Sequence, residues 1–171
     1  MSYFSVDVEG DGQIPNKYSM VCFGAVLVSD TTKTFYGKTK PISKEWNPEA
    51  LSISGFSRED HEGFDEPKEV MEKFAKWIEE VNVHGRPIFI TDNPAYDWQF
   101  INYYFHMYLG KNPFGFSARR IGDLYCGMTK DSFAKWKHLR DTSHTHNPVD
   151  DAKGNAEVLV KLQKMGLKIK L

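Results

Sequence analysis

Three β-strand patterns fill the first forty residues of the chain, before any long helical pattern begins. Alternating or continuous apolar residues predict strands at 3–9, 18–29 and 33–40, with a turn at Asp30-Thr31-Thr32. The later patterns predict helices at 47–54, 66–81, 94–109, 121–129, 131–138 and 148–165, and a short buried strand at 87–91. Three adjacent strands followed by helix, strand and helix predict an α/β fold with a mixed central sheet flanked by helices.

The length and composition place the chain among globular proteins. Its 171 residues, 40% hydrophobic and 26% charged, suit one domain spanning 1–171. No apolar run approaches the ~20 residues of a membrane span, and the start lacks the basic and apolar regions of a signal peptide. Cys22 and Cys126 are too few for a disulfide framework or a zinc cluster. We therefore expect a cytoplasmic protein with no membrane association.

Two acids share one face of the first predicted strand. Side chains alternate along a strand, so Asp7 and Glu9 point the same way, with Cα atoms roughly 7 Å apart. They repel each other unless a cation lies between them. The ordinary explanation of such a pair is a solvated edge strand. The segment Gly10-Asp11-Gly12, which follows directly, would let a ligand approach the backbone closely.

A third acid, Asp97, begins the apolar face of a helix. Asn93 is a suitable N-cap and Pro94 a favoured first helical residue, which places Asp97 in the first turn. The residues that share its face are Phe100, Ile101, Tyr104, Phe105 and Tyr108. An acid on a core-facing stripe is costly unless a cation or hydrogen bonds compensate. Asp97 is therefore a candidate functional residue as well as a candidate helix-dipole partner.

The same arrangement recurs at the last predicted helix, which opens with Asn147-Pro148. Asp150 is explained by helix capping. Asp151 shares a helical line with Asn155, Val158 and Leu162, so it faces the interior among apolar neighbours.

His146 precedes Asp151 by five residues, and its place beside an inward-facing acid makes it a candidate functional residue. A lone histidine is more often structural. The pair His144 and His146 also suggests a zinc site, but zinc sites normally recruit three or four His or Cys ligands. A remainder made only of carboxylates is better suited to Mg²⁺ or Mn²⁺.

These residues, in this order, resemble the DEDDh family of 3′-to-5′ exonucleases, which belongs to the ribonuclease H-like superfamily. Asp7-Val8-Glu9 matches the family's first motif, Asn93 with Asp97 the second, and His146 with Asp151-Ala152 the third. The segment 48–57 more loosely matches the family's stretch between the first two motifs. Two positions depart from the family. Many members follow the first Glu with Thr or Ser, where this chain has Gly10-Asp11-Gly12, and the third motif often carries an apolar or small residue where this chain has Pro148.

The resemblance implies a ribonuclease H-like fold and hydrolysis that uses two divalent cations, Mg²⁺ or Mn²⁺. Asp7 would bridge the ions, Glu9 and Asp151 would complete the first site, Asp97 would support the second, and His146 would be the base. Glu9 and Gly10 would lie near the terminal 3′-hydroxyl. The expected reaction releases nucleoside monophosphates from single-stranded 3′ ends of RNA or DNA; the sequence does not indicate which.

The remaining expectations concern substrate and partners. Candidate substrate contacts are Gly10, Phe56, Asn93, Trp98, Lys135 and Arg140. Phe56 and Trp98, like Tyr96, are candidates for base stacking, and the basic segment 135–140 for phosphate contacts, although each also suits ordinary core or surface. The net charge of −1 does not favour a tight non-specific nucleic-acid binder, but bound cations would reverse the sign locally. A homodimer through the aromatic segment 96–108 is a further hypothesis.

Two other functions fit the same residues. One is a hydrolase of small phosphate esters that uses the same metal site and ignores oligomers. The other is a non-catalytic nucleic-acid-binding or scaffold domain, which the interior acids disfavour because a binding module has no use for mutually repelling carboxylates.

Overall fold

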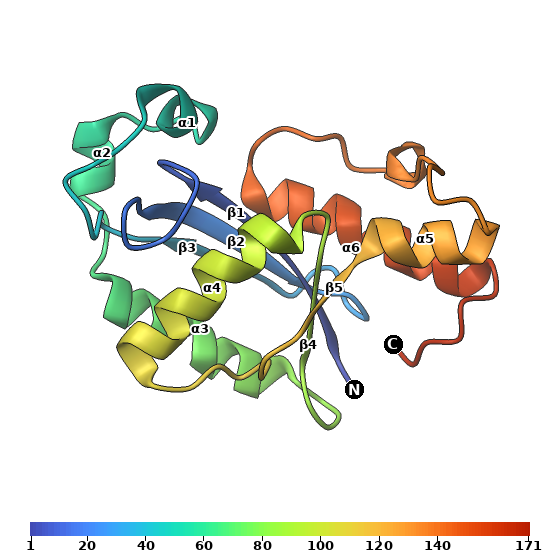
Figure 1. Ribbon diagram of the computed structural model, residues 1–171. Helices are drawn as coiled ribbons and strands as arrows, with labels where there is room; N and C mark the ends of the chain where they lie inside the picture. The colour runs from blue at the N-terminus through green and yellow to red at the C-terminus, as the bar shows by residue number, and fades with distance from the viewer.

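A five-stranded mixed sheet forms the centre of the computed structural model, which describes all 171 residues (Figure 1). The strand order is β3-β2-β1-β4-β5. The strands are β1 (Tyr3–Gly10), β2 (Met20–Leu27), β3 (Thr34–Lys38), β4 (Ile88–Thr91) and β5 (Ala118–Arg120). β1, β2 and β3 form an antiparallel meander, whereas β4 and β5 run parallel to β1 and to each other. The predicted mixed α/β sheet is confirmed.

The central strand β1 has partners of different lengths on its two sides. It pairs with β2 along its whole length, and Asp7 lies opposite Gly24. Its pairing with β4 ends at Ser5 and Ile90. The second half of β1 therefore extends beyond β4 and leaves room beside it at the carboxyl end of the sheet, where ligands bind in open α/β folds.

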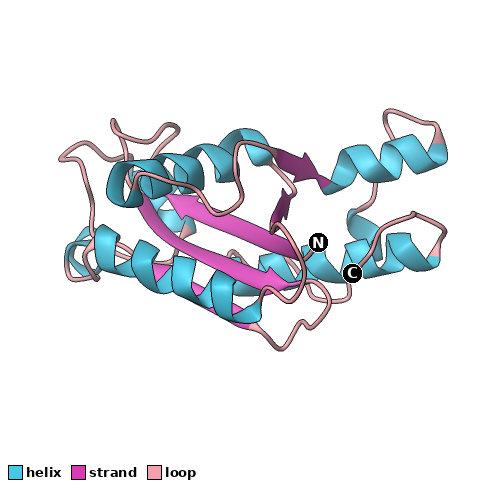
Figure 2. Cartoon of the chain, turned by 90° about the horizontal axis from the view of Figure 1, so that it is seen from below, coloured by secondary structure: helices cyan, strands magenta, loops and turns pink.

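Helices pack on both faces of the sheet (Figures 1 and 2). α3 (Pro67–Val81) and α4 (Pro94–Leu109) cover one face, and α5 (Ile121–Thr129) and α6 (Pro148–Lys164) cover the other. The short helices α1 (Pro48–Ile53) and α2 (Arg58–Glu62) follow β3, and the 3₁₀ helix η1 (Lys137–Leu139) precedes α6. None of the helices combines the length and the apolar composition of a transmembrane span.

Two apolar clusters follow from the alternation of side chains along β1. Phe4, Val6 and Val8 pack under α3 and α4 in a largely aromatic cluster. Tyr3, on the opposite face, joins a cluster with Ala152 and other residues of α6. Asp7 and Glu9 have the parity of Tyr3, so they point toward the side of the sheet that α6 covers.

The predicted elements agree with the structure, with three exceptions. The helix expected at 131–138 is wrong: a turn follows α5, and only Lys137–Leu139 is helical. Lys130 ends α5 in the left-handed conformation, with a φ of 57°. The side chain of Asp131 then accepts the backbone N–H of Phe133, which favours a turn over a helix. α2 and the three-residue β5 were not anticipated, because both are too short for a periodic pattern.

Candidate active site

Asp97 lies in the space that β4 leaves beside β1. Its Oδ1 accepts the backbone N–H of Val8 at 3.1 Å, so the carboxylate continues the hydrogen bonding of the sheet where β4 has ended. The hydroxyl of Thr91, the last residue of β4, donates to its other oxygen. Asp97 is only 4% exposed. Asn93 does not cap α4 with its side chain, contrary to expectation; its carbonyl accepts the N–H of Asp97 instead.

Asp151 approaches the same point from the opposite face. Gly24, the partner of Asp7 on β2, allows this approach: a Cβ there would lie 2.3 Å from the carbonyl carbon of Pro148. The first turn of α6 therefore packs directly on β2 beside Asp7. The carboxylate of Asp151 is fully buried.

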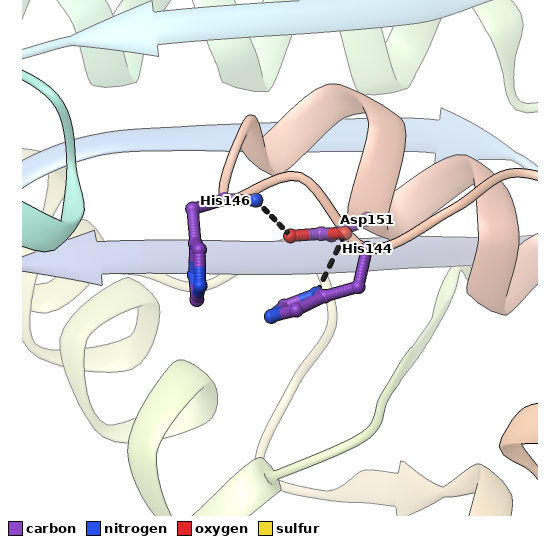
Figure 3. A group of neighbouring side chains, drawn as sticks. All are labelled: His144, His146 and Asp151. Carbon is purple, nitrogen blue, oxygen red and sulfur yellow. Dashed lines mark hydrogen bonds and ion pairs between the residues drawn. The ribbon is translucent and has the colours of Figure 1, made fainter.

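The turn before α6 is organised around Asp151, as Figure 3 shows. Oδ1 of Asp151 accepts the backbone N–H of Thr145 at 3.2 Å, and Oδ2 accepts that of His146 at 3.1 Å. Nδ1 of His144 lies 2.8 Å from Oδ1. His146 has a φ of 60°, a conformation that is strained for a residue other than glycine and is held here by these bonds. Its side chain is 53% exposed, and its Nδ1 lies 3.8 Å from Oε1 of Glu9.

The four acids predicted from the sequence converge. Carboxylate oxygens of Asp7, Glu9 and Asp151 lie within 4.8 Å of one another. Asp97 lies close enough for its charge to raise the pKa of both Asp7 and Glu9. Burial, then Asp97, Glu9 and Asp151, raise the pKa of Asp7 well above its usual value. Burial, then Asp151 and Asp97, raise the pKa of Glu9 to about 7. Burial also raises the pKa of Asp97 to about 7, against the hydrogen bonds from Thr91 and Val8.

A cavity of about 350 Å³ opens onto this cluster. Asp7, Glu9, Asp97 and both histidines of the turn line it. Its other walls come from the end of β1, α1 and the start of α4, through Val8, Gly10, Gln13, Ala50, Ile53, Asp92, Asn93 and Tyr96. Ile53 lines the cavity and is 50% exposed although it is apolar, so the cavity has an apolar surface as well as its acids.

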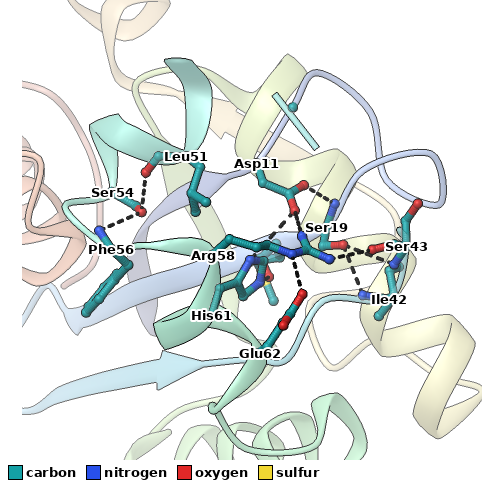
Figure 4. A network of polar contacts seen from close by, with 12 residues as sticks. Asp11, Ser19, Ile42, Ser43, Leu51, Ser54, Phe56, Arg58, His61 and Glu62 are labelled. Carbon is teal, nitrogen blue, oxygen red and sulfur yellow. Dashed lines mark hydrogen bonds and ion pairs between the residues drawn. The ribbon is translucent and has the colours of Figure 1, made fainter. Parts of the chain in front are cut away.

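A buried polar network holds α2 against the end of β1 and the start of β2 (Figure 4). Asp11 is fully buried and accepts Nη1 of Arg58 at 3.1 Å and the backbone N–H of Ser19 at 2.5 Å. Arg58 also donates to the carbonyl of Ser43 at 3.0 Å. His61 donates through Nε2 to the carbonyl of Met20 at 3.3 Å, and burial lowers its pKa to about 4, so its ring is neutral. Asn47, the N-cap of α1, donates its backbone N–H to the carbonyl of Asp11 at 2.7 Å, so Asp11 also anchors the helix that carries Ile53.

The donor chemistry of the cluster fits divalent cations. Buried carboxylates that repel one another are stable only with protons or with cations between them. Oxygen donors alone are the ligand type of Mg²⁺ and Mn²⁺. A second set, His144, His146 and Asp151, also has its ligand atoms within 4.8 Å and shares Asp151 with the first. Asp151 therefore supplies a third potential metal ligand beside His144 and His146, which the spacing of the sequence did not reveal.

The six expected substrate contacts lie in different places. Gly10 and Asn93 line the acidic cavity. Phe56 packs edge-on against Phe64 with ring centroids 4.9 Å apart, outside the cavity. Trp98 packs against Phe89, with centroids 5.1 Å apart, and lines a different depression.

The two basic candidates also differ. Lys135 lines a neighbouring groove. Arg140 turns inward: its guanidinium lies 5.2 Å from the ring of Trp136 and donates to the amide oxygen of Asn155. Segment 96–108, expected at a dimer interface, buries Phe100, Phe105 and other apolar residues in the core.

Comparison with known proteins adds independent information. No family model matches the chain. A protein of Escherichia coli named 3′-5′ DNA exonuclease Cap18 is 38% identical over 181 residues, which cover 99% of this chain and 95% of that protein. The nuclease domain of 3′hExo, described as a DEDDh family member bound to rAMP, superposes with a TM-score of 0.80 at 20% identity, over 99% of this chain and 94% of the other.

Two further solved structures share the fold. Cell-death related nuclease 4 superposes with a TM-score of 0.77 at 15% identity, over 96% of this chain and 64% of the other. A zinc-bound complex of E. coli ExoI with single-stranded DNA superposes with a TM-score of 0.71 at 15% identity, over 98% of this chain and 41% of the other. At these identities the superpositions establish the ribonuclease H-like fold, and the full-length similarity to Cap18 establishes the activity. The chain therefore belongs to the DEDDh family and is a 3′-to-5′ exonuclease.

Proposed function

We propose that the protein removes nucleoside monophosphates one at a time from 3′ ends of single-stranded DNA, using two divalent cations, Mg²⁺ or Mn²⁺. The observation that carries the proposal is the convergence of Asp7, Glu9, Asp97 and Asp151 at one end of the sheet, with the pKa values of three of them raised. The choice of DNA is supported by the name of the E. coli relative.

In this proposal Asp7, Glu9, Asp97 and Asp151 would hold the cations. When bound, two divalent cations stabilise the attacking and the leaving oxygens of a phosphodiester. The carboxylates must be deprotonated to bind them, so loading of the site releases protons. Apart from these acids, the two histidines and Asp92, which pairs with Lys137, the lining of the cavity carries no ionisable carboxylate or cation.

His146 takes the proton of the attacking water on a ring nitrogen. Its half-exposed ring lies at the mouth of the cavity, and its backbone is fixed by Asp151, so the ring is held at the edge of the acid cluster. Imidazole is the side chain that most often serves as a general base. Glu9 and the backbone of Gly10 lie at the end of β1, where the terminal 3′-hydroxyl would be placed.

The terminal nucleotide enters the cavity between α1 and α4. Ile53 offers an apolar surface to the base, while Asn93 and Gln13 offer polar groups nearby. The proposal keeps the chain as a single exonuclease domain, residues 1–171, because one sheet carries both apolar clusters. A cytoplasmic location belongs to the same proposal and rests on the composition alone.

A digestion series tests this function. The protein is incubated with matched 5′-labelled single- and double-stranded DNA and RNA, with Mg²⁺ or with Mn²⁺. We expect a ladder that shortens from the 3′ end of single-stranded DNA and chromatograms that contain only nucleoside monophosphates. His146→Ala should lower the rate by about 10²- to 10⁴-fold while calorimetry shows unchanged Mn²⁺ binding; His84→Ala, at an exposed histidine of the loop between α3 and β4, is the matched control.

Several outcomes would contradict the proposal. A substrate labelled at the 5′ end that stays intact while mononucleotide esters are cleaved would indicate a hydrolase of small phosphate esters. Equal digestion of RNA and DNA would remove the DNA preference and leave the exonuclease activity. Near-full turnover in His146→Ala would remove the base assignment.

A further inference from the structure

A groove of about 440 Å³ lies between α5 and the turn that follows it. In Figure 1 the chain leaves the far end of α5, folds back over it and then arches to the start of α6. Arg120, Lys135 and Lys137 line the groove together with Phe133. It contains none of the residues that line the acidic cavity.

The groove adjoins the acidic cavity at Asp92. Asp92 lines the cavity, and its Oδ2 pairs with Nζ of Lys137 at 2.8 Å. Its backbone carbonyl accepts Nε of Arg120 at 3.0 Å. Both basic residues line the groove, so a strand that leaves the cavity past Asp92 meets the groove next.

Phe133 is presented at the groove rather than packed into the protein. Its side chain is 89% exposed, and no aromatic ring or cation lies against it. The turn that carries it is nevertheless well fixed. Asp131 donates its N–H to the carbonyl of Cys126 at 3.1 Å and accepts the N–H of Ala134 at 3.2 Å. Its side chain accepts the N–H of Phe133 at 2.9 Å.

An exposed aromatic residue also occurs at Phe116, which has an ordinary explanation. Phe116 is 88% exposed, but Arg86 lies over its ring at 5.4 Å. Phe133 lacks such a partner, and it lines the groove together with Arg120, Lys135 and Lys137. A fixed, unpartnered ring beside basic side chains is the combination that binds single-stranded nucleic acid, because bases stack on the ring and phosphates pair with the cations.

The charges of the groove leave Lys135 available. Arg120 pairs with Asp123 at 3.2 Å, and Lys137 pairs with Asp92. Lys135 is exposed and has no ion pair. A phosphate in the groove would therefore meet the unpaired ammonium group of Lys135. It would also meet Arg120 and Lys137, whose carboxylate partners are exposed or half-buried.

We propose that this groove binds the upstream nucleotides of the strand whose 3′ end occupies the acidic cavity, with a base stacked on Phe133 and a phosphate paired with Lys135. The proposal rests on the exonuclease function and adds a second subsite to it. It makes the length of the substrate matter, because only an oligomer reaches both sites.

The test compares long and short substrates in Phe133→Ala and Lys135→Ala. For single-stranded DNA of about eight nucleotides we expect Phe133→Ala to raise KM about fivefold or more, the loss of one stacked base. For a dinucleotide and for the p-nitrophenyl ester of thymidine 5′-phosphate we expect kcat/KM within about twofold of the wild type. Lys135→Ala should also lower the slope of log KM against log salt by about 0.7, the share of one phosphate on a single strand.

Matched substitutions outside the groove provide the controls. Phe116→Ala removes an equally exposed ring, and Lys76→Ala removes a lysine of α3, on the other face of the sheet. Both should behave as the wild type on every substrate. If Phe133→Ala and Lys135→Ala lose nothing on the long substrate, or lose as much on the dinucleotide, the groove is not a substrate subsite. A wild type that leaves all oligomers intact would instead overturn the exonuclease proposal itself.

Discussion

The backbone N–H of His146 donates to Oδ2 of Asp151 at 3.1 Å. One carboxylate therefore fixes the left-handed turn that presents His146 and also faces Asp7 and Glu9. The position of the proposed base and the position of the acid cluster depend on the same side chain. A change at Asp151 should affect both, whereas a change at its neighbour should affect neither.

Asp151→Asn should lower hydrolysis by roughly a hundredfold or more, because it removes an oxygen ligand and part of the anchor of the turn. Asp150→Asn is the matched control. Asp150 is half-buried, accepts only the hydroxyl of Thr145 at 3.2 Å among side chains, and lies outside the acid cluster. Initial rates on labelled single-stranded DNA and Mn²⁺ titrations on both variants provide the measurement. Equal losses in the two variants would mean that Asp151 has no special role.

Gly24→Ala should separate α6 from β2 and inactivate the enzyme without touching any acid. The new Cβ would lie 2.3 Å from a backbone carbon of Pro148, so the start of α6 must move away from Asp7. We expect a loss of stability of roughly 1–3 kcal/mol and weaker metal binding. Denaturant unfolding and Mn²⁺ calorimetry measure the two effects.

The matched glycine for this experiment is Gly127 in α5. A Cβ at Gly127 meets nothing within 4 Å. Gly127→Ala should therefore be neutral or stabilising by about 0.5–1 kcal/mol through helix propensity. If Gly24→Ala bound Mn²⁺ as tightly as Gly127→Ala, close packing of α6 on β2 would not be what positions Asp151.

Metal binding should stabilise the protein more at higher pH. The folded-state pKa of Glu9 is raised from 4.5 to about 7 by burial and by Asp151 and Asp97. Between those values the folded protein keeps a proton that the unfolded chain has lost, so the metal-free protein loses stability as the pH rises through this window. Bound cations replace those protons. We expect the rise in Tm caused by millimolar Mn²⁺ to be larger at about pH 8 than at about pH 5.5.

Glu9→Gln provides the check on that assignment. The amide cannot titrate, so the metal-free variant should lose less stability than the wild type across the same pH window. Differential scanning fluorimetry in EDTA and in Mn²⁺ gives both curves. A Tm shift that does not depend on pH would mean that the acids are already ionised in the metal-free protein.

Much of the acid cluster was predictable because each member belongs to a local pattern. Asp7 and Glu9 follow the alternation of a strand, and Asp97 and Asp151 lie on apolar helical stripes. Local periodicity therefore identified the side chains that face inward. Their meeting point follows from the order β3-β2-β1-β4-β5, which places the ends of β1 and β4 together.

The substrate contacts were less predictable because they depend on how distant segments meet. Ile53 and Gln13 line the cavity, although neither belongs to a chemical motif. The sequence places Arg140 in a basic segment suited to phosphate contacts, yet its guanidinium packs on Trp136 and donates to Asn155. Phe133 lies in a stretch that was expected to be helical, so its exposure on a fixed turn was not foreseen.

Zinc should inhibit the enzyme through His144. Nδ1 of His144 lies 2.8 Å from Oδ1 of Asp151, and the ligand atoms of His144, His146 and Asp151 all lie within 4.8 Å of one another. Two imidazoles and a carboxylate suit zinc better than magnesium. A zinc ion there would occupy both the proposed base and a ligand of the proposed catalytic cations. We expect micromolar Zn²⁺ to inhibit hydrolysis supported by millimolar Mg²⁺.

His144→Ala removes one of the three ligands and should raise the inhibitory zinc concentration roughly tenfold. Each variant is compared with its own rate in Mg²⁺ alone, so that any change in basal rate cancels. His84→Ala, at an exposed histidine of the loop between α3 and β4, should be as sensitive as the wild type. If His144→Ala is equally sensitive, zinc acts by displacing cations from the carboxylates alone, because those ligands are the same in both proteins.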